Sequence, residues 1–379
     1  MTSAPLFPSP LDGAAGRPLE GVKVLECSSY LSGPLCAQML SDLGAHVLKV
    51  EPPTGDPYRN FGHKQGGTSV PWTNANHGKK SVSLDLKAPQ DMQRMKALIA
   101  EADLYIENWR PHVSASLGLG YEATRALNPR LVHFSITGFG ADGPAASEPA
   151  YDALLQGRTG LAFFEAAGGT PKASESYLVD KIVAVFCAQM ALAALVKRDR
   201  TGQAVHLQTS MLDIMSYFNF TDMFQNMTYL EDTAAPAYTP QPILATLDGH
   251  IVVSPVTGKQ LGRTLEAVGH PEWKEDLKRI TDKKEMTRTF FERVAGPLKT
   301  RSSAEWVAVF TEMDVPVAPV NSPREHFSDP QVLHNRIYSE MDTPSGRIRV
   351  PRHPAQIDGQ LLTPRSPAPA IGQHNPPDA

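Results

Sequence analysis

The residue with the clearest chemical potential is an aspartate that stands directly before a long apolar stretch. The run Tyr177-Leu-Val-Asp180 precedes residues 181–197, whose apolar side chains recur at helical spacing. An Asp at a helix start often accepts hydrogen bonds from the unpaired N–H groups of the first turn. The same carboxylate is also a potential covalent nucleophile. The local sequence leaves both interpretations of Asp180 open, and the cap is the commoner one.

Familiar cofactor and metal motifs are a poor match to this chain. The run Gly138-Phe-Gly140-Ala-Asp-Gly143 has dinucleotide spacing, but Pro144 and a polar stretch follow it where a phosphate-binding helix is required. The turn Ser28–Pro34 holds a single glycine rather than the spaced glycines that bind a pyrophosphate. The sequence has no Walker loop, no Gly-x-Ser-x-Gly and no His pair at metal-ligand spacing. Nicotinamide chemistry and a metal site are therefore not predicted.

Composition narrows the class of protein further. The 379 residues are 41% apolar and carry a net charge of −4 without a long basic run, so we expect no nucleic-acid or membrane partner. The longest apolar stretch, residues 182–196, is interrupted by Gln189 and is predicted to be too short for a bilayer. The three cysteines are odd in number and far apart, which argues against disulfides. The N-terminus lacks a secretory pattern, and a cytoplasmic location is expected.

The elements that must position Asp180 follow an alternating pattern through the first half of the chain. Helical patterns at residues 35–43, 89–102 and 113–127 separate short apolar runs, as in βαβ units on a parallel sheet. The pattern predicts a Rossmann-like α/β fold. The predicted strands are residues 22–27, 46–51, 81–86, 103–109 and 131–137, with a further strand at 204–209 after the long helix.

The second half contains a smaller unit and a return segment. An aromatic- and Met-rich helix is predicted from about residue 211 to 230, and residues 232–242 have the composition of a linker. A hairpin at 243–254 turns on Asp248-Gly249, and a second one turns near Pro344-Ser-Gly346 before a Pro-rich tail. We expect a large domain from residues 1–230, a small α+β domain from 243–320, and a segment from 330–379 that completes the large domain.

Ordered sequence blocks run through nearly the whole chain. They include Leu19–Glu26, Gly33-Pro34, Asp42–Ala45, Leu48–Pro53, Gly55-Asp56, Asn76–Ser81, Leu84–Lys87, Glu107–Pro111, Leu117–Leu119, Asn128-Pro129, Gly138–Gly140, Tyr151-Asp152, Asp180, Arg198–Gly202, Asp248-Gly249, Val315–Val320 and Gly372–His374. Together these blocks resemble the family III CoA-transferases, the group of formyl-CoA, carnitine-CoA and bile-acid-CoA transferases.

The resemblance assigns a covalent role to Asp180. In such enzymes the matching Asp attacks an acyl-CoA thioester, forms a mixed anhydride, and is then converted to an aspartyl-CoA thioester from which an acceptor carboxylate takes the CoA. The resemblance also implies an interlocked homodimer whose large domain is built from both chain ends around a parallel sheet. It implies acyl-CoA and a small carboxylic acid as substrates, with no tightly bound cofactor.

The resemblance further implies a set of CoA contacts. Tyr30 and Leu31 match residues near the nucleotide end of CoA. The segment of Asn76 and Lys79 matches one whose Lys meets a CoA phosphate. The remaining implied contacts are Asn108 and Trp109 along the pantetheine path, Arg110 near phosphate, and Tyr151 near the reacting carbonyl.

The same fold also hosts 2-methylacyl-CoA racemases, which remain an alternative, as does a CoA-binding protein without catalysis. Racemases place a His immediately before the Asp that matches Asp152, and this chain has Tyr151 there. A phenol with a pKa near ~10 is a poor base at neutral pH, so transfer is favoured over racemisation. Pro52, Ser116 and Pro149 stand where formyl-CoA transferases place basic residues near the nucleotide of CoA. We therefore expect other residues to bind the CoA phosphates in this chain.

Overall fold

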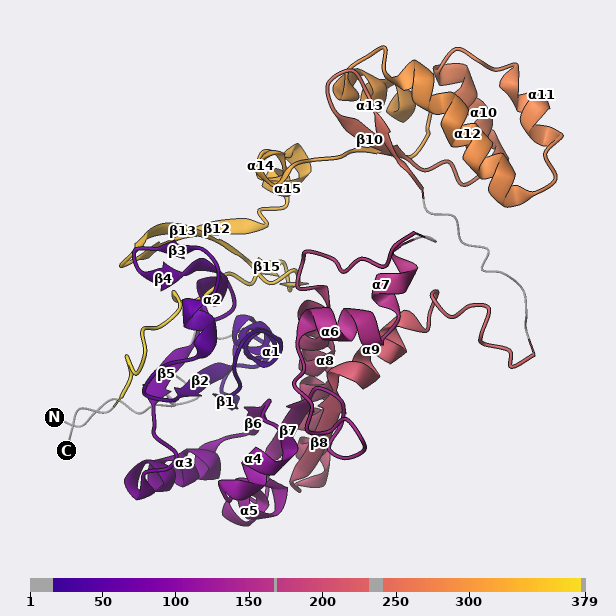
Figure 1. Ribbon diagram of the computed structural model, residues 1–379. Coiled ribbons are helices and arrows are strands. Elements are labelled where there is room, and N and C mark those ends of the chain that lie inside the picture. Colours follow the sequence, from indigo (N-terminus) through magenta and orange to yellow (C-terminus); the bar gives the residue numbers. More distant parts are fainter. Residues whose placement is uncertain (1–15, 167–168, 232–240, 376–379) are drawn as a thin grey trace. The chain divides into compact units, whose positions relative to one another are not determined.

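The protein is described by a computed structural model covering residues 16–166, 169–231 and 241–375 (Figure 1). The chain divides into two compact units. Met1–Gln225 and Arg336–Ala379 form the first, and Asn226–Asn335 form the second. Most of the predicted linker, at residues 232–240, lies outside the described residues.

The first unit is built on a six-stranded sheet in which every neighbouring pair is parallel. Its strand order is β5-β2-β1-β6-β7-β8. In chain order these strands read 3-2-1-4-5-6, which is the Rossmann arrangement. The predicted α/β class is confirmed. The strands are β1 (Lys23–Cys27), β2 (His46–Glu51), β5 (Lys80–Ser83), β6 (Leu104–Glu107), β7 (Val132–Thr137) and β8 (Val205–Ser210).

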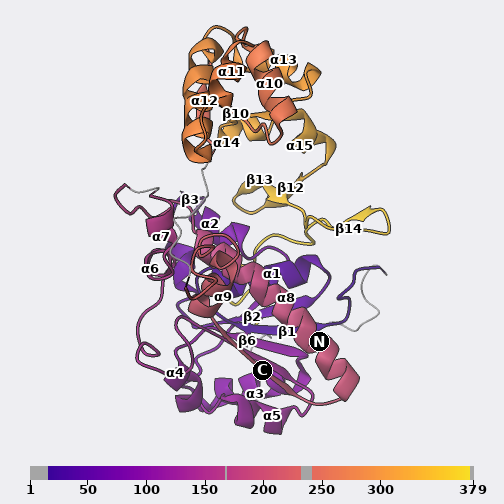
Figure 2. The same cartoon turned by 90° about the vertical axis from the view of Figure 1, so that its right-hand side faces the viewer.

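Helices cover both faces of this sheet because its strands alternate between two apolar cores. Val24 and Ile106 face a core shared with α1 (Ser32–Asp42), α8 (Leu178–Thr201) and α9 (Met211–Asn219). Their neighbours on the same strands, Leu25 and Tyr105, face the opposite side and pack in a core shared with α3 (Pro89–Glu101). Figure 2 shows α1 and α8 on one side of the sheet and α3 on the other. The period-two alternation of each strand thus specifies the layered fold.

Helix α8 begins earlier than its apolar pattern indicates. Tyr177 is the N-cap residue, and no side chain caps the helix, so Asp180 is the third helical residue. The interpretation of Asp180 as a helix cap is wrong, because Leu178 and Val179 extend the helix before it. At 24 residues α8 is also long and apolar enough to cross a membrane, which corrects the estimate from residues 182–196. Its buried apolar side chains instead pack in the core with α1.

Shorter elements complete the first unit. The helices are η1 (Pro57–Asn60), α2 (Val70–Asn74), α4 (Pro111–Ser116), α5 (Tyr121–Leu127), α6 (Asp152–Arg158) and α7 (Leu161–Phe164), and β3 (Lys64–Gln65) pairs with β4 (Thr68–Ser69). The helix predicted for residues 211–230 ends at Asn219, and turns follow.

The C-terminal segment joins this unit without adding a strand to the six-stranded sheet. It forms the hairpin β12 (Tyr338–Thr343) and β13 (Gly346–Pro351), which confirms the predicted turn, and the short pair β14 (Gln356–Ile357) and β15 (Gln360–Leu361). The backbone N–H of His374 then donates to the Ser81 carbonyl at 2.9 Å, so the tail runs beside β5. Both ends of the chain therefore contribute to the large unit.

The second unit is a small α+β body with its own core. Its sheet pairs β9 (Ile243–Ala245), β10 (His250–Val253) and β11 (Val317–Pro319) antiparallel, and the predicted turn on Asp248-Gly249 is confirmed. Phe290, Trp306 and Phe310 are buried in its core. Its helices are α10 (Gly258–Ala267), α11 (Trp273–Lys278), α12 (Lys283–Leu298), α13 (Ser303–Glu312), α14 (Pro323–His326) and α15 (Pro330–His334).

Candidate active site

A cavity of about 830 Å³ opens in the large unit at the carboxyl ends of the parallel strands. The strand order reverses between β1 and β6, and the loops that follow these two strands line the cavity. Ligands of open α/β sheets bind at such a switch point. Most of the residues singled out from the sequence meet here, namely Tyr30, Leu31, Asn108, Trp109, Arg110, Tyr151 and Asp180.

Asp180 reaches this cavity from the first turn of α8 and is held by two other elements. The hydroxyl of Ser32, at the start of α1, donates a hydrogen bond to Oδ1 of Asp180. The backbone N–H of Asp180 donates to Oδ2 of Asp152, at 3.0 Å. Gln156 in turn bonds to the other oxygen of Asp152 and to the backbone of Ser174. Both the backbone and the side chain of Asp180 are therefore fixed.

The electrostatic surroundings keep the Asp180 carboxyl close to its titration range. Burial raises its pKa to about 6, the bond from Ser32 lowers the pKa in part, and the charge of Asp152 raises it. A carboxylate with this pKa is ionised at neutral pH, yet it is more basic than an exposed Asp. It is consequently a better nucleophile than an ordinary surface aspartate.

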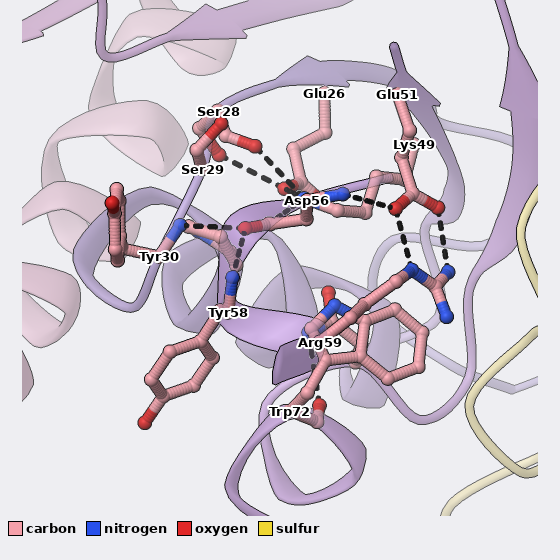
Figure 3. Close-up of polar contacts among 12 residues, drawn as sticks. Glu26, Ser28, Ser29, Tyr30, Lys49, Glu51, Asp56, Tyr58, Arg59 and Trp72 are labelled. Atoms are coloured by element: carbon pink, nitrogen blue, oxygen red, sulfur yellow. Dashed lines mark hydrogen bonds and ion pairs between the residues drawn. The ribbon is translucent and has the colours of Figure 1, made fainter. Parts of the chain in front are cut away.

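The turn between β1 and α1 presents Tyr30 and Leu31 to the cavity. Tyr30 has φ 65°, in the left-handed region that is unusual for a bulky residue. Oδ1 of Asp56 accepts the N–H groups of Tyr30 at 3.2 Å and Tyr58 at 2.9 Å (Figure 3). Asn108 accepts the N–H of Ser29 at 2.9 Å and donates to its carbonyl at 2.8 Å. These bonds hold the turn in its strained shape.

A buried charge cluster lies beneath this turn. Lys49 donates to Oε1 of Glu26 and to the Ser28 carbonyl, both at 2.8 Å, and pairs with Asp56 at 3.0 Å. Burial alone would lower the pKa of Lys49, but the surrounding carboxylates led by Glu26 raise it overall. Glu51 binds Arg59 through both oxygens, at 2.6 and 2.7 Å (Figure 3). The cluster ties β1, β2 and η1 together under the cavity.

Asn76 and Lys79 do not line the cavity. Lys79 is almost fully buried. Its ammonium group donates three hydrogen bonds, to Oε2 of Glu26, the Pro34 carbonyl and Oδ1 of Asn76, all at 2.7 Å. Burial lowers the pKa of Lys79 to about 8. In this arrangement Lys79 neutralises Glu26 and leaves no donor for a phosphate.

Aromatic side chains form much of the cavity wall. Tyr30 meets Tyr151 edge to face at 6.0 Å between ring centroids, and Phe61 meets Tyr177 in the same way at 6.0 Å. Arg110, exposed at the start of α4, is the only basic side chain among the described residues that line the cavity. The cavity therefore offers aromatic surface around Asp180 and a single cation.

Sequence reasoning missed several residues that shape this site. Ser32 and Gln156 carry no motif of their own, and Asp56 stood only in the family block Gly55-Asp56, without an assigned role. The clearest available signal was Asp56, in the turn after β2, because the carboxyl ends of neighbouring parallel strands meet at one edge. Asp152 stood in the quoted Tyr151-Asp152 pair, but its contact with the backbone of residue 180 emerges only from the fold.

Comparisons with known proteins agree on one family. Residues 19–375 match the model of CoA-transferase family III. The chain is 30% identical over 373 residues to human succinyl-CoA:glutarate CoA-transferase, covering 94% of this chain and 84% of the relative. It is 29% identical over 352 residues to acetyl-CoA:oxalate CoA-transferase of Acetobacter aceti, covering 90% of each.

Solved structures agree with these sequence matches. A CaiB/BaiF family protein from Brucella suis superposes with a TM-score of 0.82 at 28% identity, covering 94% of this chain and 97% of its own. A crystal structure of Rv3272 from Mycobacterium tuberculosis gives a TM-score of 0.83 at 28% identity, with 95% and 98% coverage.

Proposed function

The chain belongs to CoA-transferase family III, and on that premise we propose that Asp180 is the covalent nucleophile with which it moves CoA from an acyl-CoA donor to a free carboxylic acid. The enzyme class, an acyl-CoA:carboxylate CoA-transferase, follows from relatives at about 30% identity across most of the chain. The covalent route through Asp180 is the part that we add.

In the proposed reaction, Oδ2 of Asp180 attacks the thioester carbonyl, and the carbon–sulfur bond breaks to release CoA thiolate. The product is a mixed anhydride between the acyl group and Asp180. The thiolate then attacks Cγ of Asp180, and the donor acid leaves as a carboxylate. An acceptor carboxylate repeats these steps in reverse, forming the new acyl-CoA and regenerating Asp180. No oxidant, reductant or metal is required for this sequence.

One observation carries the proposal: a half-buried carboxylate lies in the cavity at the switch point, held by Ser32 and Asp152. A nucleophile fixed beside a bound thioester reacts in an effectively intramolecular step, which lowers the barrier by as much as ~7 to 11 kcal/mol. The pKa of about 6 leaves Asp180 ionised at neutral pH.

We propose that CoA lies along the residues lining the same cavity. Asn108 and Trp109 would accompany the pantetheine arm, and the exposed guanidinium of Arg110 would meet a phosphate. Arg158 on α6 is already paired with Glu148 of the cavity lining, at 2.7 Å. For that reason we assign no second substrate carboxylate to Arg158.

We also propose that the enzyme works as a homodimer. The family resemblance implies it, and the large unit exposes apolar side chains on adjacent helices. Val185 on α8 and Tyr217 and Phe218 on α9 are 54%, 75% and 46% exposed. An exposed apolar patch of this kind is typical of an interface.

The proposal is tested by following CoA exchange between a panel of acyl-CoA donors and free acids by mass. Asp180→Asn is expected to abolish exchange while CoA still binds. Asp199→Asn, a surface change on the same helix, is expected to leave exchange intact. Racemisation of a 2-methylacyl-CoA without exchange would support the alternative activity. Wild-type rates in Asp180→Asn would refute the covalent role.

A further inference from the structure

We infer that Ser32 is a further catalytic residue: its hydroxyl stays bonded to Oδ1 of Asp180 and donates to the oxyanion that forms there each time Cγ of Asp180 is attacked. The inference rests on the proposed nucleophilic role of Asp180. It adds a residue that no motif marks and assigns separate tasks to the two carboxylate oxygens.

The contact between Ser32 and Asp180 joins two helices. Ser32 is the first residue of α1, is 5% exposed and lies in the cavity wall. Its Oγ donates to Oδ1 of Asp180 in the first turn of α8, a residue 148 positions later in the chain. Neither helix has a side-chain cap bond at its own N-terminus. The serine hydroxyl therefore bonds to the Asp180 carboxylate and does not cap its own helix.

The turn before Ser32 leaves this hydroxyl little freedom. Asn108 holds the backbone of Ser29 through two hydrogen bonds. Asp56 accepts a hydrogen bond from the N–H of Tyr30 (Figure 3). On the other side, a Cβ added at Gly33 would lie 2.5 Å from the side chain of Ser28, so the chain is closely packed there. Ser32 is thus preorganised, as donors to a developing oxyanion must be.

The chemistry at Cγ gives this donor its task. In the anhydride, Oδ2 bridges to the acyl group and Oδ1 is the carbonyl oxygen. When CoA thiolate adds to Cγ, the electron pair of that carbonyl moves to Oδ1. When the carbon–Oδ2 bond then breaks, the donor acid departs and Oδ1 becomes the carbonyl oxygen of the aspartyl thioester. The acceptor acid passes through the same oxyanion in reverse, with thiolate as the leaving group.

The charged and titratable groups around Asp180 come from several elements. Asp152 of α6 bonds to its backbone, and Tyr58 of η1 lies close enough for the Asp180 charge to raise the Tyr58 pKa, after burial and Tyr177. Lys181, the next residue of α8, is directed to the hydroxyl of Ser176 at 2.6 Å. Among the described residues, Ser32 is the side chain that donates a hydrogen bond to the Asp180 carboxylate.

Ser32→Ala tests the role through rate and pH together. Loss of one oxyanion donor predicts a fall in kcat of roughly a hundredfold or more, with little change in KM for acyl-CoA. Because the Ser32 bond lowers the pKa of Asp180, the acid limb of the pH profile is expected to move upward from about pH 6. Ser41→Ala is the matched control, since it removes a buried hydroxyl of α1 that bonds to the Gly78 carbonyl at 2.9 Å, remote from Asp180.

Each outcome decides the matter. A threefold or smaller loss of kcat with an unmoved acid limb would leave Ser32 a structural residue. If Ser32→Ala is unstable, Ser32→Cys keeps a side chain of similar size with only a weak donor; a tenfold loss of kcat supports the role, and wild-type kcat overturns it. Failure of the wild-type enzyme to form an Asp180–CoA adduct would refute the proposed function itself, independently of Ser32.

Discussion

At the scale of single residues, the position of Asp180 supports its proposed role as an ionised nucleophile. It sits inside the first turn of α8 rather than at its cap, and burial raises its pKa to about 6. Sequence patterns identified this residue through the family blocks. They placed its helical position wrongly because the apolar period alone did not include Leu178 and Val179.

The raised pKa predicts an acid limb in the rate profile. In the proposed route Asp180 attacks as the carboxylate, so kcat/KM is expected to fall as the pH drops below about 6. The charge of Asp152 contributes to the raised pKa. Asp152→Asn removes that charge and should shift the limb to lower pH, as measured by initial rates across pH 4.5–8. A shift to higher pH would contradict the assigned electrostatics.

The same pKa predicts a stability cost at neutral pH. The folded protein binds the Asp180 proton more tightly than the unfolded chain, so this group favours folding at low pH and loses that contribution as the pH rises through about 6. A shift from 3.8 to about 6 corresponds to about 3 kcal/mol at most. Asp180→Asn should therefore melt at higher temperature than wild type at pH 8, with the gap closing near pH 4. A gap independent of pH would contradict this.

Arg110 is expected to act on CoA binding rather than on chemistry. Among the described residues that line the cavity, Arg110 is the one with a basic side chain. Arg110→Gln should raise KM for acyl-CoA about tenfold with little change in kcat, because the proposed phosphate contact would be made equally in the ground and transition states. Arg125→Gln, on the surface of α5, is the matched control. Equal KM values for the two variants would remove Arg110 from the CoA site.

At the scale of elements, the strands of the sheet could be predicted well because each is a short apolar run with turn residues on both sides. The predicted 46–51 is β2 (His46–Glu51), and the others differ by a few residues at their ends. What the sequence could not reveal is the buried charge cluster. Lys79 and Glu26 are far apart in the chain, and only the pairing of the strands brings them to 2.7 Å.

This cluster predicts a severe effect for one lysine. Lys49→Met leaves Asp56 buried without its cation, while Glu26 keeps only Lys79, and this should destabilise the large unit by roughly 3–5 kcal/mol. Lys87→Met, an exposed change near β5, should have almost no effect. The midpoints of thermal unfolding measure the difference. Similar midpoints for the two variants would show that the cluster does not stabilise β1 and β2.

At the scale of the whole molecule, the family blocks predicted what periodicity could not. The alternation of strands and helices indicated a parallel sheet, but the order β5-β2-β1-β6-β7-β8 depends on long-range pairing. The return of the C-terminal segment to the large unit was inferred from the family resemblance. The structure shows this return through contacts such as that of His374 with Ser81. Ser81 and His374 are 293 positions apart in the chain. Local sequence patterns carry no information about a contact over such a separation.

The exposed apolar patch of α8 and α9 predicts the oligomeric state. Sedimentation velocity at micromolar concentration should give a species of twice the 41.2 kDa of one chain. Phe218→Asp should weaken or abolish this dimer, because a charge would be buried without a partner. Phe327→Asp, a similar change in the second unit, is the control. A monomeric wild-type protein would contradict the proposed homodimer.

The most direct test of the central claim is to look for CoA on Asp180. Purified enzyme is incubated with an acyl-CoA donor in the absence of acceptor, and its intact mass and peptides are measured. The covalent route predicts an adduct of CoA minus water on the peptide that contains Asp180, which an added acceptor acid removes. Turnover without any such adduct on Asp180, or an unchanged adduct in Asp180→Asn, would contradict the account.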